Sequence, residues 1–246
     1  MSEWYKNWFA SEEYLEVYRH RNEEDANDLL NLILKSVNLQ ANSFVLDSAC
    51  GAGRHSAALK EKGFNVTAFD LSKSLLKIGK RNSKKLNRQI DFFCSDIRNV
   101  SLKFKFDLII NLFTSFGYFN TDEENFSFIK QSKNLLKVGG YFVFDYFNKS
   151  DLIKNLVPET INVQNSKTYS EKRFIENDRV IKEINIKGNG VKNNYIESVM
   201  LYSPEKIISI FETTGYIIQN IYGDYKGSPF HFENSERLIL IATNNG

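Results

Sequence analysis

The sequence has little of what marks secreted, membrane or metal-binding proteins. Its 246 residues include only two cysteines, Cys50 and Cys94, three prolines and three histidines. Two isolated thiols offer neither a disulfide framework nor the paired spacing of a zinc site, so we expect a reducing, cytoplasmic setting and no metal. With no internal repeat and no low-complexity linker, one compact body is the simplest organisation.

Charge of one sign and long apolar runs are also missing. The 32 Lys and Arg residues nearly balance the 30 Asp and Glu residues, and the formal net charge is +2. That balance gives no strong field for nucleic acid or for a membrane surface. No segment approaches the roughly 18 uninterrupted apolar residues of a membrane span. The segment "MSEWYKNWFASEEYLEVYRHR" lacks the apolar core and cleavage site of a signal peptide. Nucleic acid and membranes are therefore not the expected partners.

Hydrophobic periodicity predicts strands that alternate with helices from residue 43 onward. Apolar runs typical of buried strands cover residues 43–47, 64–70, 90–96, 106–113, 141–147, 216–222 and 237–243. Helical patterns cover residues 26–37, 54–63 and 73–86, and a further helix is predicted from Thr121, with Glu124 in a capping box, to Gly139 and Gly140. Ser203 and Pro204 mark the start of a last helix.

This order predicts an α/β fold with a doubly wound, mostly parallel seven-stranded sheet of the Rossmann-like kind. Residues 165–202 alternate in shorter strands with turn signals at Asn177-Asp178 and Gly188-Asn189-Gly190, which indicates an antiparallel β insertion late in the chain. We expect a helical lid in residues 1–40, a cofactor-binding core in 41–149, a substrate-covering insertion in 150–202 and completion of the core sheet in 203–246.

A glycine-rich turn follows the first predicted strand. In "VLDSACGAGRH", residues 45–55, small residues surround Gly51 and Gly53, which leaves room for a ligand against bare backbone. Asp70 ends the second strand and Asp96 ends the third. In an open parallel sheet ligands bind at the carboxyl ends of the strands, where an acid can hold the hydroxyls of a ribose. The three strand ends together predict a nucleoside site.

The kind of nucleoside is indicated by the charges and side chains at this turn. Asp47 precedes the glycines by four residues, and a carboxylate so close would oppose a diphosphate but would suit a cationic amino group. Ser56 only partly matches the third small residue of a dinucleotide pocket. The pattern therefore favours a positively charged nucleoside over a dinucleotide.

These residues resemble the class I S-adenosylmethionine-dependent methyltransferases. "VLDSACGAG" looks like their first motif, "DLS" at 70–72 like their second, "SDI" at 95–97 like their third and "NLFTSFGY" at 111–118 like their fourth. The late strands look like those of amino-sugar N-methyltransferases, a small-molecule branch. The resemblance implies that S-adenosylmethionine is the cofactor. It also implies cofactor contacts from Asp47, Ala49, Gly51, Gly53, Asp70, Leu71, Ser95, Asp96, Ile97, Asn111 and Leu112, with Asp70 on the ribose and Leu71 and Ile97 beside the adenine.

Two further groups of residues concern the lid and the acceptor. The resemblance implies that Tyr14 and Arg21 close over the cofactor. The alternative is that Tyr14 is an ordinary core residue and that Arg21 is solvated. Methyl transfer to an amine or hydroxyl requires that a base remove a proton at some point. Position at the same sheet edge makes His231, Tyr118 and Asp145 candidates for this base, and an acceptor wall is expected from Phe116, Tyr118, Tyr146, Asp224, Tyr225 and His231.

The expected activity is methyl transfer to a small organic acceptor, at nitrogen or oxygen rather than carbon. The alternatives are a nicotinamide-dependent oxidoreductase, a module that binds the nucleoside without chemistry, and an RNA or protein methyltransferase. The insertion would cover the acceptor or form a homodimer contact.

Overall fold

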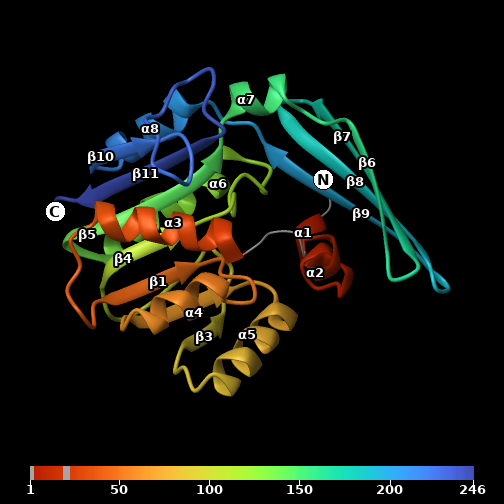
Figure 1. Cartoon of the computed structure of the whole chain (residues 1–246). Helices are drawn as coiled ribbons and strands as arrows, with labels where there is room; N and C mark the ends of the chain where they lie inside the picture. The colour runs from red at the N-terminus through yellow and green to blue at the C-terminus, as the bar shows by residue number, and fades with distance from the viewer. Residues whose placement is uncertain (1–2, 19–22) are drawn as a thin grey trace.

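The computed structural model describes residues 3–18 and 23–246 (Figure 1). In this part of the chain, seven strands form one sheet in the order β10-β11-β5-β4-β1-β2-β3. Strands β1 to β5 run parallel, and β11 is antiparallel to both of its neighbours. The doubly wound, mostly parallel sheet predicted from the sequence is confirmed. Its strands are β1 (Phe44–Ser48), β2 (Asn65–Asp70), β3 (Asp91–Cys94), β4 (Phe106–Asn111), β5 (Leu136–Phe147), β10 (Tyr216–Tyr222) and β11 (Arg237–Asn244).

Helices cover both faces of this sheet because its central strands are apolar on both sides. One face packs against α3 (Glu23–Ser36), α4 (Arg54–Glu61) and α5 (Lys73–Lys85). The other packs against α6 (Asp122–Leu135) and α8 (Pro204–Thr213). The predicted helix starts are confirmed, since Thr121 Oγ1 and Ser203 Oγ each accept a hydrogen bond from the backbone amide three residues later, at 3.3 Å.

The end of α6 differs from the prediction. The helix ends at Leu135 rather than at the glycine pair, because β5 begins at Leu136, opposite Phe106 of β4. The glycines lie inside β5, where its register with β4 shifts. A Cβ on Gly140 would lie 3.1 Å from the Phe106 carbonyl oxygen. Gly140 therefore permits close strand approach, and Gly139 supplies a φ of 78° next to it, rather than the pair ending a helix.

A second, antiparallel sheet stands apart from the first (Figure 1). Its strands are β6 (Glu159–Gln164), β7 (Lys167–Glu176), β8 (Arg179–Gly188) and β9 (Val191–Met200), and α7 (Lys149–Lys154) leads into it. Asn177 and Asp178 form the tight turn between β7 and β8 with φ values of 50° and 56°. The antiparallel insertion expected late in the chain is therefore present, and we call it the insertion sheet.

The amino-terminal segment divides between the two sheets. Helices α1 (Trp4–Trp8) and α2 (Glu13–Val17) lie beside the insertion sheet in Figure 1. Trp8 of α1 packs in one apolar cluster with Tyr169, Ile184 and Ile186 of that sheet. Helix α3, by contrast, packs on the seven-stranded sheet. Among the residues described, no helix is long and apolar enough to cross a membrane.

Candidate active site

The glycine-rich turn after β1 is tied to the end of β2 by one carboxylate. The Gly51 amide donates a hydrogen bond to Asp70 Oδ2 at 2.7 Å, and the Ser72 amide donates to Asp70 Oδ1 at 2.8 Å. Ala49, Gly51 and Gly53 have φ values of 54°, 57° and 74°, so the chain makes three left-handed steps here. A Cβ on Gly51 would meet nothing closer than Leu75 at 4.0 Å. The turn is thus fixed in place with its open side toward a cavity.

Asp70 lines this cavity although little of it is exposed. Burial raises the pKa of its carboxyl group, and hydrogen bonds from backbone amides partly offset that rise. Each carboxylate oxygen can accept two hydrogen bonds, so both can accept another beside these amide contacts. The geometry suits the expected contact with two vicinal hydroxyl groups.

Asp47 lies beneath the turn rather than on the cavity. It is 2% exposed and its Oδ2 accepts a hydrogen bond from Ser56 Oγ in α4. Burial raises the pKa of Asp47 to about 7. The structure therefore does not give Asp47 the direct ligand contact expected from the sequence. Its charge can act on a ligand only through the turn.

Gly53 and Ser95 also lie outside the cavity lining. A Cβ on Gly53 would come within 2.7 Å of the Phe92 ring, so this glycine allows close packing of the turn on β3. The Ser95 amide donates to the Asp70 carbonyl oxygen at 3.1 Å. Both residues support the turn and the strand end, and neither has the expected ligand contact.

Strands β3 and β4 bring four more expected residues to the cavity: Asp96, Ile97, Asn111 and Leu112. The Asp96 carboxylate is already paired with Arg98, at 2.7 Å from its Nη2. Burial acts to raise the pKa of Asp96, but hydrogen bonds from Arg98 outweigh it and lower the pKa. Asn111 is 2% exposed and donates from Nδ2 to Ser48 Oγ at 3.2 Å, which fixes its amide beside the β1 turn.

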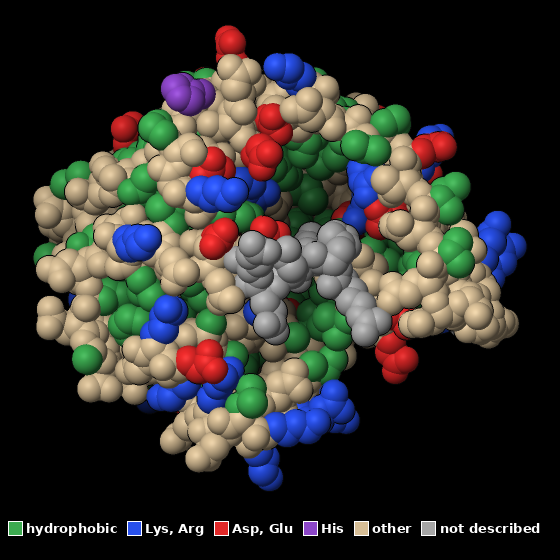
Figure 2. Space-filling view, in the orientation of Figure 1, with side chains coloured by type: hydrophobic (Ala, Val, Ile, Leu, Met, Phe, Trp, Pro, Cys, Tyr) green, Lys and Arg blue, Asp and Glu red, His purple; other side chains and the backbone are tan. Residues whose placement is uncertain are grey.

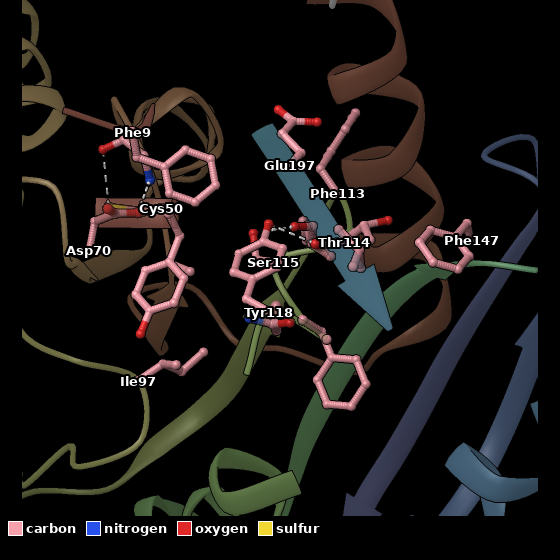
Figure 3. Close-up of a pocket in the computed structure, with 18 of the residues that line it drawn as sticks. Phe9, Cys50, Asp70, Ile97, Phe113, Thr114, Ser115, Tyr118, Phe147 and Glu197 are labelled. Carbon is pink, nitrogen blue, oxygen red and sulfur yellow. Dashed lines mark hydrogen bonds between the residues drawn. The ribbon is translucent and has the colours of Figure 1, made fainter. Parts of the chain in front are cut away.

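One cavity of about 810 Å³ connects these strand ends to the insertion sheet. Figure 2 shows apolar side chains gathered in a hollow, with charged side chains at its rim. In Figure 3, Asp70 and Cys50 lie on one side and Phe147 on the other, with Tyr118 between them. Expected residues that line the cavity are Tyr14, Ala49, Gly51, Asp70, Leu71, Asp96, Ile97, Asn111, Leu112, Phe116, Tyr118 and Tyr225.

A strained turn after β4 forms the wall beyond the cofactor residues. Phe113 and Thr114 have φ values of 54° and 60°, and both line the cavity. The Phe113 amide donates to Asp145 Oδ2 at 2.7 Å, and the Thr114 amide donates to the Asp145 carbonyl oxygen at 3.1 Å. Arg237 of β11 pairs with Asp145 Oδ1 at 2.7 Å and bonds Thr114 Oγ1 at 3.0 Å. Asp145 therefore holds the turn in its left-handed conformation.

Three expected acceptor or catalytic residues are placed elsewhere. His231 is exposed in the segment between β10 and β11 and does not line the cavity. Asp224 accepts hydrogen bonds from the amides of Lys226 and Ser228, so it stabilises a surface turn. Tyr146 is fully buried and its hydroxyl donates to the Met200 carbonyl oxygen. None of the three reaches the space where an acceptor would lie.

Asp145 and Tyr118 differ in what they can offer to an acceptor. Asp145 is fully buried, lies outside the lining, and accepts bonds from Phe113, Arg237 and Tyr225. We therefore do not retain it as a base. Tyr118 lines the cavity, and its hydroxyl donates to the Thr114 carbonyl oxygen at 2.9 Å. Of the three expected bases, Tyr118 is the one that borders the cavity.

Sequence reasoning missed a charged cluster where the insertion sheet meets the lid helices. Lys182 of β8 lies 3.2 Å from Glu197 Oε2 of β9. Glu197 also accepts hydrogen bonds from Trp8 Nε1 at 2.5 Å and from the Tyr18 hydroxyl. Lys182, Glu197 and Tyr18 line the cavity together with Arg173. Lys182 and Glu197 lie 164 and 179 residues from Tyr18 in the sequence, so no local pattern could have joined them.

The expected lid residues are only partly described. Tyr14 lines the cavity, with its ring 5.1 Å from Phe9 and 5.1 Å from Tyr18. The packing is compatible with both expected roles, a core residue and a cofactor contact. Arg21 lies outside the described residues.

A protein-family model described as a methyltransferase domain matches residues 45–140. Residues 45–140 are therefore similar to a methyltransferase domain. This match spans the β1 turn, Asp70, Asp96 and Asn111. For these residues, the match agrees with the methyltransferase class expected from the sequence.

Relatives of the methyltransferase domain include YqeM from Bacillus subtilis, which is 32% identical over 102 residues, or 41% of each chain. The chain thus matches less than half the length of that relative. Over the whole fold, it resembles an S-adenosylmethionine-dependent methyltransferase from Clostridium acetobutylicum, at 22% identity and a TM-score of 0.82, covering 98% of this chain and 99% of the other. It also resembles CalS10, an amino pentose methyltransferase from Micromonospora echinaspora, at 17% identity and a TM-score of 0.71, covering 95% and 97%.

Proposed function

We propose that the protein transfers a methyl group from S-adenosylmethionine to the nitrogen or oxygen of a small organic acceptor. One observation carries the proposal: a single cavity of about 810 Å³ runs from Gly51 and Asp70 to Glu197 on the insertion sheet. Small-molecule pockets measure roughly 300–1,000 Å³, so this one suits a nucleoside with a second small molecule beside it.

The residues at the strand ends fit the cofactor. When bound, S-adenosylmethionine supplies a methyl group on a positively charged sulfur. Asp70 would accept hydrogen bonds from the ribose hydroxyls, and Leu71 and Ile97 would flank the adenine. Ala49 and Gly51 offer bare backbone to the methionine part, with Asn111 and Leu112 as the floor. Burial raises the pKa of Asp47 to about 7, and a cationic group bound above the turn would favour its ionised form.

The chain acts on the reaction mainly by positioning. Holding a nucleophile in line with the methyl carbon supplies much of the acceleration, and the departing thioether needs no proton. The strained turn at Phe113 and Thr114 shapes the wall opposite the cofactor residues. Tyr118 on the same loop borders the cavity, and we assign its hydroxyl to contact with the acceptor N–H or O–H. Aromatic walls exclude water while leaving polar tips for an organic ligand.

The far end of the cavity favours a polar acceptor. Arg173, Lys182 and Glu197 line it from the inner face of the insertion sheet. Such side chains can hydrogen-bond the hydroxyl and amino groups of a sugar-like molecule. The likeness to an amino pentose methyltransferase supports the same acceptor class, with an amine as the methylated group.

Two measurements, made one after the other, test the proposed function: cofactor binding and then methyl transfer. Calorimetric titration should show that S-adenosylhomocysteine binds and NAD does not, and the reverse would favour an oxidoreductase. Radiolabelled S-adenosylmethionine should then transfer label to the small-molecule fraction of a metabolite extract. Label in the protein or RNA fraction would favour a macromolecular acceptor. Binding without transfer across varied extracts would favour a non-catalytic nucleoside module.

We further propose a homodimer through the insertion sheet. Strand β6 is at the edge of that sheet, and its Ile161 and Val163 are 67% and 73% exposed on one face. An exposed apolar edge strand is a template for pairing with another copy. Light scattering after size exclusion should give a dimer mass, and Ile161→Lys with Val163→Lys should give a monomer. Val138→Lys, at an exposed position of β5, is the matched control; a wild-type monomer would refute the dimer.

The proposed compartment is the cytoplasm. Cys50 and Cys94 are both free thiols, as expected in a reducing environment. Fractionation of cells that express the protein, followed by thiol labelling, should recover it with both cysteines reduced in the cytosolic fraction.

A further inference from the structure

Two buried side-chain nitrogens have no hydrogen-bond partner among the residues described: Nε1 of Trp4 and Nε2 of His55. The residues are 7% and 8% exposed. Native structures pair the great majority of buried polar side-chain atoms, because an unpaired one carries a desolvation penalty. Both residues line the same cavity. Both unpaired nitrogens thus belong to residues at a cavity where a bound ligand can supply the missing hydrogen-bond partner.

Trp4 lies in the cavity between Phe9, which follows α1, and Tyr118. Its ring centroid is 5.8 Å from that of Phe9 and 5.2 Å from that of Tyr118. The Phe9 carbonyl oxygen accepts a hydrogen bond from Ser72 Oγ at 2.6 Å, and the Ser72 amide donates to Asp70. Leu71 packs against the same apolar cluster as Trp4. Helix α1 is thereby anchored over the carboxyl end of β2, where the ribose is expected.

His55 lies on a different wall. Its ring centroid is 5.1 Å from that of Phe113, which in turn is 5.4 Å from Tyr225. That wall belongs to the strained turn after β4. Of the two residues with an unpaired nitrogen, Trp4 is the one whose helix is tied to the end of β2, where the ribose is expected.

The chemistry of the indole narrows its partner. An indole N–H donates and cannot accept, so its partner must be a lone pair. Adenosine offers ribose oxygens and ring nitrogens as acceptors. In the methionine part the ammonium group has no lone pair but the carboxylate can accept, so a response to adenosine alone distinguishes the two acceptors.

We propose that Trp4 Nε1 donates a hydrogen bond to the adenosine part of S-adenosylmethionine and so selects the nucleoside. The proposal rests on the cofactor of the proposed function. It adds a cofactor contact from helix α1, outside the matched domain at 45–140.

The two tryptophans of the chain allow a direct test, since the protein gives two indole N–H signals in a ¹⁵N–¹H correlation spectrum. Trp4→Phe assigns them. Adding adenosine or S-adenosylhomocysteine to the wild-type protein should move the Trp4 signal downfield and slow its exchange with solvent. The Trp8 signal should stay in place, because that N–H already donates to Glu197.

Calorimetry measures what this hydrogen bond contributes to the binding affinity. Trp4→Phe should weaken the binding of adenosine and of S-adenosylhomocysteine by the same factor, about fivefold, as expected for one hydrogen bond. Trp8→Phe is the matched control, because it removes an indole N–H that faces Glu197, and it should change both affinities less than twofold.

Four outcomes overturn the inference. These are an unmoved Trp4 signal in a protein that binds S-adenosylhomocysteine, a response to S-adenosylhomocysteine but not to adenosine, unchanged affinities in Trp4→Phe, and equal losses in both tryptophan variants. A wild-type protein that binds neither probe would instead overturn the proposed function itself.

Discussion

The carboxylate of Asp145 accepts a hydrogen bond from the backbone amide of Phe113 at 2.7 Å, across neighbouring parallel strand ends. This contact fixes a residue with φ 54°, followed by a β-branched residue, Thr114, with φ 60°. Such backbone is costly for residues other than glycine and persists only where surrounding contacts hold it. The wall of the proposed acceptor site is therefore held in shape by Asp145 of β5 and Arg237 of β11, which lie well apart from the turn in sequence.

Replacement of Asp145 should destabilise the protein strongly. Asp145→Asn removes the charge that Arg237 pairs with and one of two acceptor oxygens, in a fully buried position. Breaking a buried ion pair on one side costs about 3–5 kcal/mol. Urea unfolding should show a loss in that range. Asp178→Asn is the control, because Asp178 pairs with Lys149 at the surface and its replacement should cost less than about 1 kcal/mol. Similar losses in the two variants would contradict the assigned role of Asp145.

Asp70 should control cofactor affinity. Asp70→Asn keeps one acceptor oxygen for the Gly51 or Ser72 amide but removes the negative charge and half of the acceptors that face the cavity. We expect S-adenosylhomocysteine to bind at least about tenfold more weakly, in keeping with the loss of one charged hydrogen bond. Calorimetry measures the change, and Asp91→Asn, on the exposed start of β3, should bind like the wild type. Unaltered binding by Asp70→Asn would exclude the ribose contact.

Asp47 should make stability fall as the pH rises. Its pKa is about 7 in the folded protein, against an ordinary value of 3.8. Between these values the folded protein keeps a proton that the unfolded chain has lost, so the free energy of unfolding decreases with pH from about 4 to about 7. The difference between the two pKa values corresponds to about 4 kcal/mol.

The variant Asp47→Asn tests this because its amide oxygen can still accept the Ser56 hydrogen bond. Thermal unfolding between pH 4.5 and 8 should show a flatter profile for Asp47→Asn than for the wild type, with the largest gain in stability at the alkaline end. Asp178→Asn should keep the wild-type profile. Parallel profiles for wild type and Asp47→Asn would show that Asp47 does not carry the effect.

Gly53 and Gly63 separate two costs of adding a methyl group. Both have positive φ, 74° and 90°, but a Cβ on Gly53 would meet the Phe92 ring at 2.7 Å, while one on Gly63 meets nothing within 4 Å. Gly63→Ala should cost about 1–2 kcal/mol for its backbone alone. Gly53→Ala should cost about 1–3 kcal/mol more because of overpacking. Chemical denaturation of both variants provides the comparison, and equal costs would mean that the Phe92 contact is relieved.

The sequence was sufficient for features that depend on neighbouring residues. Alternating apolar runs predicted the parallel sheet, and Thr121 and Ser203 marked helix starts, because these signals are local. The carboxyl ends of β1, β2, β3 and β4 meet at one edge, so Gly51, Asp70, Asp96 and Asn111 could be placed together from topology alone.

The sequence could not predict in the same way where a single side chain points or which residues it contacts. Asp47 is the next-to-last residue of β1, close to the turn, yet its side chain points beneath the turn to Ser56. Asp145 was expected at the sheet edge as a candidate base. Its carboxylate oxygens are instead bonded to Arg237, 92 residues later in the chain, and to the strained turn after β4. His231 follows a polar segment near the last strand, and the chain there carries it to the surface. Each outcome depends on contacts between distant parts of the chain.

The bonds from Trp8 and Tyr18 to Glu197 join residues 189 and 179 positions apart. During synthesis, Trp8 and Tyr18 therefore cannot make these bonds until β9 has left the ribosome. The cavity is therefore completed late, and a nascent chain stalled before residue 197 would carry the glycine-rich turn without the wall that Glu197 contributes.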